Sequence, residues 1–322
     1  VTVNRYCSSS LQTTRMALHA IKAGEGDVFV SAGVESVSSF VTGNADGLPN
    51  TKNPKFAYAE ARTAKLAEGG VAWTDPRGDE QIPDVYIAMG QTAENVASAT
   101  GISREEQDRW GVRSQNRAEE AIKNGFFERE ITPVTLPDGT VVSADDGPRA
   151  GTTYEGISQL EPVFRPDGTV TAGNACPLND GAAALLVMSE ERANKLGLTP
   201  LARVVSSAVS AVEPERMGLG PVEASRRALG RAGLQMRDIA LVEMNEAFAA
   251  QVIPSARALE IPDEKLNVNG GAIALGHPFG MTGARLTTTL LHALRARGGR
   301  YGLATLCVGG GQGMAVIYER LA

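Results

Sequence analysis

Short apolar strands alternate with helices near the N-terminus. Val1 to Asn4 alternates apolar and polar residues and predicts a strand, and residues 27–33 predict a short buried strand. Between them, the residues from Leu11 to Ala23 predict a helix that Gly24 ends. Apolar side chains lie on more than one face of this helix, so we expect it to be largely buried.

The C-terminal part of the chain repeats this alternation. The same reasoning predicts strands at residues 181–188, 202–211, 238–244, 266–269, 303–307 and 314–318, and helices at residues 190–196, 221–232 and 282–297. Another helix is expected after Phe248, where Pro254 should produce a kink or an early end.

The segment from about Glu35 to Pro166 differs in composition from the segments on either side. Turn-rich polar stretches, such as residues 42–47, alternate with helical ones. The clearest helix runs from Ser103 to Lys123 and begins with the spacing of a capping box. We therefore expect an insertion here and not a layer of the main sheet.

Two segments share one order of parts. A strand, Cys7, a helix and a strand follow one another near the N-terminus, and a strand, the His277 loop, a helix and a strand do so near the C-terminus. This order indicates an internal duplication of an α/β unit with a mixed sheet.

Composition and charge narrow the function classes. A chain of 322 residues is expected to form two or three structural units, and no apolar run is long enough to span a membrane. A net charge of −6 argues against a nucleic-acid binder, so a phosphate-bearing ligand needs a local basic patch. Three cysteines, an odd number, favour a reducing compartment, and we expect a cytoplasmic location. Because the chain opens on Val1 and not on Met, we expect upstream sequence to be missing.

His277 lies in the loop with the clearest functional pattern. Residues 269–285 contain five glycines, and His277 stands between Gly276 and Pro278. Glycine permits close backbone approaches, and proline fixes φ and removes a donor. Such loops hold a side chain in place against a ligand, so His277 is a candidate acid or base.

Cys7 and Cys307 are candidate thiols for the same chemistry. Cys7 lies where a helix begins, and free N–H groups there favour a thiolate; a small buried core residue is the competing interpretation. Cys307 precedes three glycines, which allow backbone N–H groups to approach a ligand oxygen, although a tight hairpin also explains them.

Other candidates carry less specific patterns. Asn245, at a strand end, can orient a water or a carbonyl, or can cap a helix. Cys176 is interpreted as a packing residue, and His19 and His292 as structural or solvated residues on helices. No His or Cys pair has zinc spacing, and the triple glycine lacks the spacings of the phosphate loop and of the Rossmann motif. We therefore expect no metal.

Four segments together resemble the active-site segments of the thiolases. They are Val3 to Ser10 around Cys7, Asn245 to Phe248, Gly276 to Pro278, and Cys307 to Gly311, and they occur in the family's order and spacing. The resemblance runs essentially from Val1 to Ala322.

The resemblance implies a fold of two similar βαβαβαββ halves in a layered α/β core with an inserted loop domain. By this resemblance, residues 1–36 and 176–198 belong to the N-terminal half, residues 37–175 to the CoA-binding loop domain, and residues 199–322 to the C-terminal half. The first elements of the N-terminal half are expected to be absent from this chain.

The resemblance also implies a role for each candidate. Cys7 is the expected nucleophile of a 3-ketoacyl-CoA thiolase, His277 its activator, and Cys307 the second acid or base. One oxyanion hole combines His277 with a water held by Asn245, and the other combines the N–H groups of Cys7 and Gly309. Coenzyme A is expected as a substrate, with no permanently bound cofactor.

The expected CoA contacts by this resemblance are Met89, Phe164, Ala172, Phe248 and Arg149, with Arg149 at the nucleotide end. Many acetoacetyl-CoA-specific members carry His-Met-Gly where this chain has Ala88-Met89-Gly90, and Ser where it has Cys176. The smaller Ala88 leaves room for a longer or branched acyl chain.

Several functional alternatives stay open. The expected pathway is fatty-acid β-oxidation, and a biosynthetic thiolase that forms acetoacetyl-CoA is the alternative. A ketoacyl synthase shares the fold but uses a second histidine where this chain has Asn245 and Cys307. A non-catalytic subunit of a β-oxidation complex is a further alternative. A homodimer or homotetramer is expected, with a hydratase–dehydrogenase subunit as a potential partner.

Overall fold

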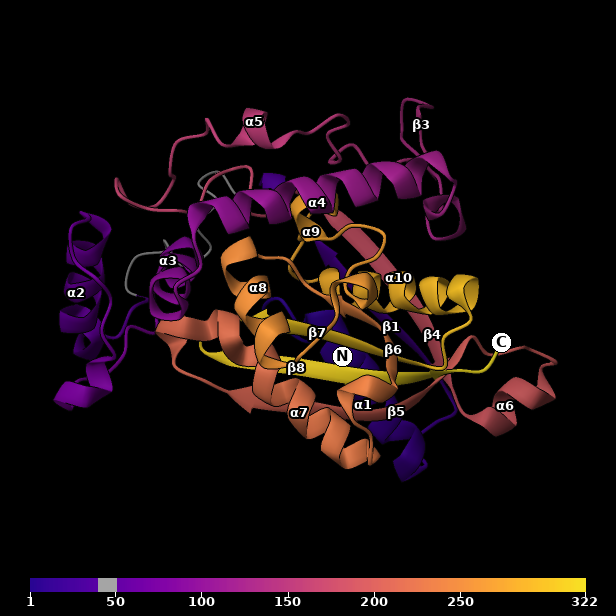
Figure 1. Ribbon diagram of the computed structural model, residues 1–322. Coiled ribbons are helices and arrows are strands. Elements are labelled where there is room, and N and C mark those ends of the chain that lie inside the picture. The colour runs from indigo at the N-terminus through magenta and orange to yellow at the C-terminus, as the bar shows by residue number, and fades with distance from the viewer. Residues whose placement is uncertain (40–50) are drawn as a thin grey trace.

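A mixed four-stranded sheet forms the centre of the C-terminal part (Figure 1). The computed structural model describes residues 1–39 and 51–322, so the polar stretch at residues 42–47 lies outside the described residues. The strands of the sheet lie in the order β5 (Ala202–Ala211), β8 (Gln312–Arg320), β7 (Tyr301–Val308) and β6 (Ile239–Met244). β5, β8 and β7 pair antiparallel, whereas β7 and β6 pair parallel. The apolar runs of β7 and β8 are buried because helices cover both faces.

Helices lie on both sides of this sheet. α7 (Gly220–Ala232) packs against β5, β8 and β7, and α10 (Thr282–Arg297) packs against β6 and β7 on the other face. α1 (Ser9–Ala23) lies beside α10. The predicted helices at these positions are confirmed, including the left-handed glycine that ends α1 at Gly24 and the one that ends α7 at Gly233.

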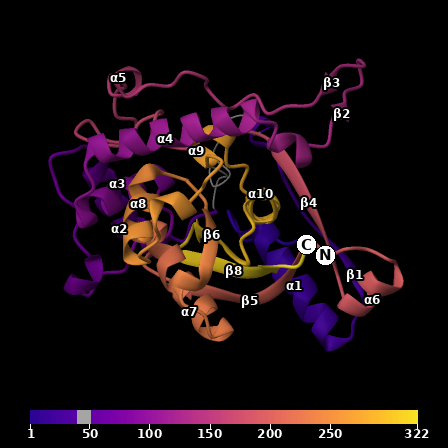
Figure 2. The ribbon, with the colours of Figure 1, turned by 45° about the vertical axis from the view of Figure 1, so that its right-hand side comes forward.

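A two-stranded ribbon forms the next layer (Figure 2). β1 (Val28–Glu35) pairs antiparallel with β4 (Gly181–Met188), and one face of the ribbon packs against α1 and α10. Its other face is apolar and exposed: Val30 and Val34 are each 71% exposed, and Leu186 is 59% exposed. The strands predicted at residues 27–33 and 181–188 are confirmed.

The chain between β1 and β4 adds helices over one edge of these layers. It contains α2 (Ala57–Ala67), α3 (Met89–Thr100), α4 (Arg104–Lys123), α5 (Tyr154–Ile157) and the hairpin of β2 (Val134–Thr135) and β3 (Val141–Val142). The predicted capping box of α4 is present between Ser103 and Glu106. Within the described part of this segment, no strand joins the four-stranded sheet or the ribbon of β1 and β4.

Three short helices complete the fold: α6 (Glu190–Lys195), α8 (Ala249–Ala258) and α9 (Ala272–Leu275). α8 does not end at Pro254 but continues to Ala258, so an early end at the proline is wrong. α9 lies in the histidine loop, directly before Gly276 and His277.

Two predicted strands are absent. Residues 1–4 pair with no strand among the described residues, although their sequence alternates. Residues 266–269 form only isolated bridges, because Asn267 adopts a φ of 45° and its side-chain amide hydrogen-bonds the Met244 N–H and carbonyl group. A side chain thus replaces the ladder contacts that a strand at this position would make.

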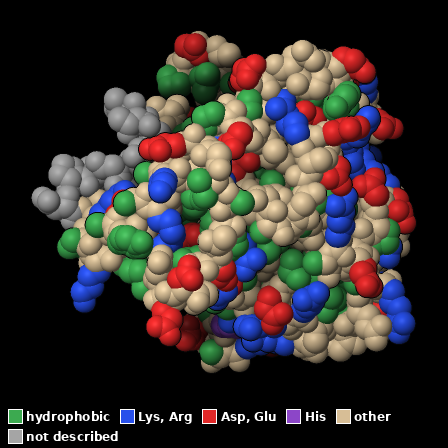
Figure 3. All heavy atoms as spheres, turned by 60° about the vertical axis from the view of Figure 1, so that its left-hand side comes forward, with side chains coloured by type: hydrophobic (Ala, Val, Ile, Leu, Met, Phe, Trp, Pro, Cys, Tyr) green, Lys and Arg blue, Asp and Glu red, His purple; other side chains and the backbone are tan. Residues whose placement is uncertain are grey.

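Charged side chains of both signs are interspersed on the face shown in Figure 3, where Lys and Arg lie among Asp and Glu. Opposite charges close to each other partly cancel their fields. Within the described residues, no helix is long and apolar enough to cross a membrane.

The contact between β1 and the histidine loop requires glycine. A Cβ at Gly33 would lie 1.9 Å from the Gly280 carbonyl oxygen, a backbone atom that cannot move aside cheaply. We expect Gly33→Ala to lower the free energy of unfolding by about 3 kcal/mol, measured by urea denaturation. Gly230→Ala is the matched control: its Cβ enters open space on α7, and we expect a gain of about 0.5–1 kcal/mol. Equal effects of the two substitutions would contradict this interpretation.

Candidate active site

Asn245 and Cys307 reach the same edge of the sheet because β6 and β7 are parallel. Their register pairs Met244 with Thr305, and the Asn245 N–H donates to the Thr305 carbonyl oxygen at 3.0 Å. The carboxyl ends of parallel strands meet at one edge, so Asn245 follows β6 where Cys307 nears the end of β7. Both side chains are fully buried.

Cys7 lies in a tight turn just ahead of α1. Asn4 Oδ1 accepts a hydrogen bond from the Tyr6 N–H, and the Ser9 hydroxyl accepts one from the Arg5 N–H, each at 2.9 Å. Tyr6 has a φ of 47°, a left-handed conformation that non-glycine residues rarely adopt. The turn thus stores strain next to a buried thiol, an arrangement typical of functional sites.

Two backbone N–H groups, of Cys7 itself and of Gly309, face the Cys7 sulfur. Burial is the largest influence and raises the pKa of the Cys7 thiol to about 11, while the N–H groups lower it and Glu35 raises it. The prediction that the helix start favours a thiolate is therefore wrong in its net direction. The N–H groups act as expected, but removal of the sulfur from water outweighs them, so a base must take the proton of Cys7.

Side chains on both sides fix the loop that carries Gly309. Gln312 Nε2 donates to the Gly309 carbonyl oxygen at 3.3 Å, and Gln312 Oε1 accepts from Arg5 Nη2 at 2.9 Å. Gly311 has a φ of 84°, and a Cβ there would lie 2.2 Å from a neighbouring backbone oxygen. The glycines therefore make the tight turn between β7 and β8 and also hold the Gly309 N–H toward Cys7.

His277 is held by both its backbone and its ring. The His277 N–H donates to Asn179 Oδ1 at 3.0 Å. Nδ1 lies 2.6 Å from the Thr282 hydroxyl, and that hydroxyl donates its only proton to the Pro278 carbonyl oxygen at 2.8 Å. The hydroxyl must therefore accept from Nδ1–H, which leaves the lone pair on Nε2.

The ring of His277 is neutral at ordinary pH. Burial lowers its pKa to about 3, and the charge of Arg285 lowers it further. Nε2 has no hydrogen-bond partner among the described residues, and neither do Oδ1 and Nδ2 of Asn245. Buried polar atoms are normally paired, so these atoms are available to a ligand or a water.

The three thiols lie within electrostatic reach of one another. Burial raises the pKa of Cys307 well above its ordinary value, and Cys7 and Cys176 raise it further. Burial likewise raises the pKa of Cys176 to about 12, and Cys7 adds to this effect. The Cys176 N–H donates to the Ala247 carbonyl oxygen at 3.1 Å, so its backbone packs as expected while its sulfur joins the site.

Three of the expected CoA contacts lie beside Cys307. Phe248 and Cys307 belong to one buried apolar cluster, against which Met89 and Phe164 pack. The rings of Phe164 and Phe248 meet edge to face with centroids 6.2 Å apart. A Cβ at Gly90 would lie 2.2 Å from the Phe164 ring, so glycine permits this contact. The result is an apolar wall next to a thiol.

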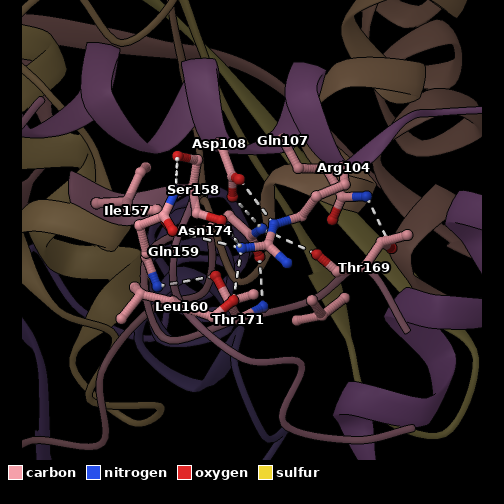
Figure 4. Close-up of polar contacts among 12 residues, drawn as sticks. Arg104, Gln107, Asp108, Ile157, Ser158, Gln159, Leu160, Thr169, Thr171 and Asn174 are labelled. Carbon is pink, nitrogen blue, oxygen red and sulfur yellow. Dashed lines mark hydrogen bonds and ion pairs between the residues drawn. The ribbon is translucent and has the colours of Figure 1, made fainter. Parts of the chain in front are cut away.

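Ala172 lies exposed in a segment that polar contacts fix to α4 (Figure 4). Asn174 Nδ2 donates to Asp108 Oδ1 at 2.8 Å and to the Thr169 carbonyl oxygen at 3.0 Å. Asn174 Oδ1 accepts from the Thr171 N–H at 2.9 Å. The backbone around Ala172 is therefore held in one conformation.

Arg149 is not brought to the apolar wall. It is exposed, its N–H donates to Gln115 Oε1 at 2.8 Å, and no contact described for its side chain reaches the other candidates. The guanidinium is therefore a candidate only for a part of a ligand that extends away from this wall.

Several residues that support the site could not be predicted from the sequence. Thr282, Asn179 and Gln312 each fix a candidate residue, but no motif or spacing marks them, because they approach only after folding. Within residues 1–39 and 51–322, no three His, Cys, Asp or Glu side chains are grouped as a metal site requires. The predicted lack of a permanently bound cofactor stays a prediction.

Comparison with known proteins identifies the class. Residues 1–191 match the family model of the thiolase N-terminal domain, and residues 198–320 match that of the thiolase C-terminal domain. The acetyl-CoA acetyltransferase of Escherichia coli (strain K12) is 47% identical over 324 residues, which cover 99% of this chain and 79% of that protein. The 3-ketoacyl-CoA thiolase of Bacillus subtilis (strain 168) is 44% identical, over 99% of this chain and 78% of that protein.

A solved structure agrees with these matches. The dimeric peroxisomal thiolase of Saccharomyces cerevisiae superposes with a TM-score of 0.86 at 37% identity, over 99% of this chain and 75% of that one. These findings define the chain as an acyltransferase enzyme with a layered α/β fold. The chain belongs to the thiolase family, and the fold expected from the sequence is confirmed.

The neutral ring of His277 makes a prediction about pH. The folded state binds the proton with a pKa of about 3 and the unfolded state with the ordinary value of 6.5, so between these values the unfolded state binds more protons. Stability is therefore lost as the pH falls below 6.5, by about 2 kcal/mol between pH 8 and pH 5.

Urea denaturation of the wild-type protein and of His277→Asn over this pH range checks the prediction. Raised carboxyl pKa values, such as that of about 8 for Glu243, act in the opposite direction in both proteins, so the difference between the two curves isolates His277. Parallel curves would show that burial does not keep His277 neutral.

Proposed function

We propose that this thiolase cleaves 3-ketoacyl-CoA with a second CoA, and runs the reverse condensation, through an acyl thioester on Cys7. The observation that carries the proposal is one buried thiol, Cys7, faced by two N–H groups, with a second thiol, Cys307, within electrostatic reach. His277 supplies a neutral ring whose Nε2 is unpaired among the described residues. These groups match the needs of a two-step acyl transfer.

The first half-reaction forms the acyl-enzyme. His277 Nε2 takes the proton of Cys7, and the thiolate attacks the 3-keto carbon of the substrate. The N–H groups of Cys7 and Gly309 stabilise the oxyanion. The bond between C2 and C3 breaks, the electron pair moves to the thioester enolate, and Cys307 protonates C2, which releases acetyl-CoA. The enolate oxygen is stabilised by the new Nε2–H of His277 and by a water that Asn245 holds.

The second half-reaction regenerates the enzyme. The Cys307 thiolate takes the proton of the incoming CoA thiol, and the CoA thiolate attacks the acyl carbon on Cys7. The Cys7 thiolate leaves as acyl-CoA forms, and the proton returns to it from His277. Every proton that leaves a residue in the first half is replaced in the second, so the site ends as it began.

Burial supports this sequence of steps. Thiol and imidazole groups that are neutral at rest require no counterion in a dry site. Charge develops only during the reaction, where N–H donors fixed by the surrounding contacts stabilise it without reorganisation. Loss of one such donor typically costs on the order of 10²–10³ in rate.

For the acyl group, we propose a chain longer than four carbons, and hence a degradative role in fatty-acid oxidation. The support is the apolar wall formed by Met89, Phe164 and Phe248, together with the small Ala88 just before it in the chain. Acetoacetyl-CoA formation is the competing function, because a relative named acetyl-CoA acetyltransferase is also similar to this chain. All five residues expected to contact CoA stay candidates for that role: Met89, Phe164, Ala172, Phe248 and Arg149. The apolar wall is therefore proposed to adjoin both CoA and the acyl group.

We extend the proposal to assembly and location. A homodimer is supported by a solved relative described as dimeric, with a homotetramer as the alternative. A cytoplasmic location is supported by three free cysteines, which favour a reducing compartment. A hydratase–dehydrogenase partner stays a prediction from the family resemblance.

Substitutions of Cys7 and of Cys307 should affect different steps of the reaction. We expect Cys7→Ala to abolish acyl transfer, lowering both thiolysis and the exchange of labelled CoA with acyl-CoA by about 10³-fold or more. Cys307→Ala should lower thiolysis by a similar factor but lower the exchange less, because exchange forms no carbanion and needs from Cys307 only the transfer of the CoA thiol proton. If Cys7→Ala retains exchange, or if Cys307→Ala retains thiolysis, these roles are wrong. A non-catalytic subunit would show no thiolysis even in the wild-type protein.

Substrate length is tested by thiolysis of 3-ketoacyl-CoAs in a chain-length series with the full-length protein. We expect kcat/KM to be at least about 10-fold higher for chains of six to ten carbons than for acetoacetyl-CoA, because each buried methylene contributes about 0.8 kcal/mol. Ala88→His is the matched variant and should reduce the advantage of the longer chains. A steep fall beyond four carbons would instead support the acetoacetyl-CoA function.

A further inference from the structure

Glu246 has a buried carboxylate that the proposed mechanism does not use. It follows Asn245 directly and is 0% exposed. Oε1 accepts from Trp110 Nε1 at 3.1 Å and from Asn267 Nδ2 at 2.8 Å. Oε2 accepts from the Ser114 hydroxyl at 2.5 Å and from the Ile273 N–H at 3.3 Å.

All four partners of this carboxylate are donors, and none is a cation. Among the described residues Glu246 forms no ion pair, and the nearby Arg113 instead bonds Asp263 and the Leu266 carbonyl oxygen. A buried carboxylate without a paired cation persists only where hydrogen bonds satisfy both oxygens. These hydrogen bonds therefore depend on the acceptor-only chemistry of a carboxylate.

The donors come from separate segments that surround the site. Trp110 and Ser114 lie on α4, and Ile273 lies on α9, three residues before Gly276. α4 packs against both α8 and α9 (Figure 1). The carboxylate thus connects the end of β6, which carries Asn245, to the short helix that leads into His277.

Further contacts of Ser114, Gly271 and Asn267 strengthen this connection. The Ser114 hydroxyl donates to Glu246 and accepts from the Gly271 N–H at 3.1 Å, so the contact continues to the residue before α9. A Cβ at Gly271 would lie 2.1 Å from the Glu246 carboxyl carbon, and glycine therefore admits the carboxylate. Asn267, another partner of Glu246, also bonds the Met244 N–H and carbonyl group at the end of β6.

We propose that Glu246 is a positioning residue for this thiolase: its carboxylate sets the spacing between Asn245 and the His277 segment, and so the geometry of the oxygen-binding site that they form. The inference rests on the proposed roles of Asn245 and His277. Glu246 touches neither substrate nor the reacting atoms. A shift of about 1 Å in a catalytic group costs on the order of 10² in rate, so a change at Glu246 should act on kcat.

Glu246→Gln tests the proposal because it keeps the shape and replaces one acceptor oxygen by a donor. We expect kcat for thiolysis to fall about 10- to 100-fold, while KM for CoA changes less than about 3-fold. Glu246→Asp keeps the charge and should retain more activity than Glu246→Gln. Circular dichroism and thermal unfolding confirm that each variant is folded at the assay temperature.

Glu215→Gln is the matched control. Its carboxylate is also buried, at 1% exposure, and it accepts from Trp73 Nε1 and the Asp84 N–H and pairs with Arg62, but none of these residues belongs to the proposed machinery. We expect a loss of stability at least as large as that of Glu246→Gln, with kcat within about 3-fold of wild type. If kcat falls equally in both, Glu246 has a general structural role only and the proposal is wrong.

A double-mutant cycle with Asn245→Ala gives a readout that a general loss of stability would not change. If Glu246 acts through the oxygen site, Glu246→Gln should cost much less in kcat in the Asn245→Ala background than in wild type. Additive effects would overturn the proposal. A wild-type protein without thiolysis would instead overturn the proposed function, so the two failures are distinguishable.

Discussion

The parallel pairing of β6 and β7 is the constraint on which the site depends. It places Asn245 and Cys307 at one edge of the sheet, and α10 packs across the same two strands. α10 begins five residues after His277, and α1, which follows Cys7, lies beside it. Asn245, Cys307 and His277 are therefore placed by their short distances along the chain from this strand pair or from α10, and Cys7 is placed by the packing of α1 beside α10. Side-chain contacts such as those of Glu246 and Gln312 then adjust the final spacing.

Exclusion of water sets the resting state of the site. Burial holds Cys7 and Cys307 as thiols and His277 as a neutral ring. A thiolate on Cys7 would be a better nucleophile than the thiol, but burial disfavours it at rest. In the proposed reaction, the fixed donors around Cys7 then act on charge that exists only while the reaction proceeds. Water in the site would favour the charged forms of these groups at rest. The donors would then stabilise the ground state as well as the transition state, and the rate enhancement would fall.

The sequence predicted the elements whose signals are local. Helix caps at Ser103 and Gly24 gave helix bounds, and the glycines around His277 and after Cys307 marked the loops of the candidate site. It failed where a tertiary contact decides the outcome. Asn267 replaces strand pairing with its side chain, and burial reverses the net effect of the helix start on Cys7. The hydrogen bond between Thr282 and His277, which fixes the His277 tautomer, could not be predicted from any motif or residue spacing.

Two of the three residues of the apolar wall come from a different part of the chain than Cys7 and Cys307. Met89 and Phe164 lie in the segment between β1 and β4, whereas Cys307 lies on β7 within the central sheet. Under the proposed function, substitutions at Met89 or Phe164 can change the shape offered to an acyl group while the strand pair and its candidate catalytic residues keep their places. Substrate range and chemistry can therefore evolve separately. This separation fits a family in which similar chains carry names that refer to different acyl groups, such as acetyl and 3-oxoadipyl.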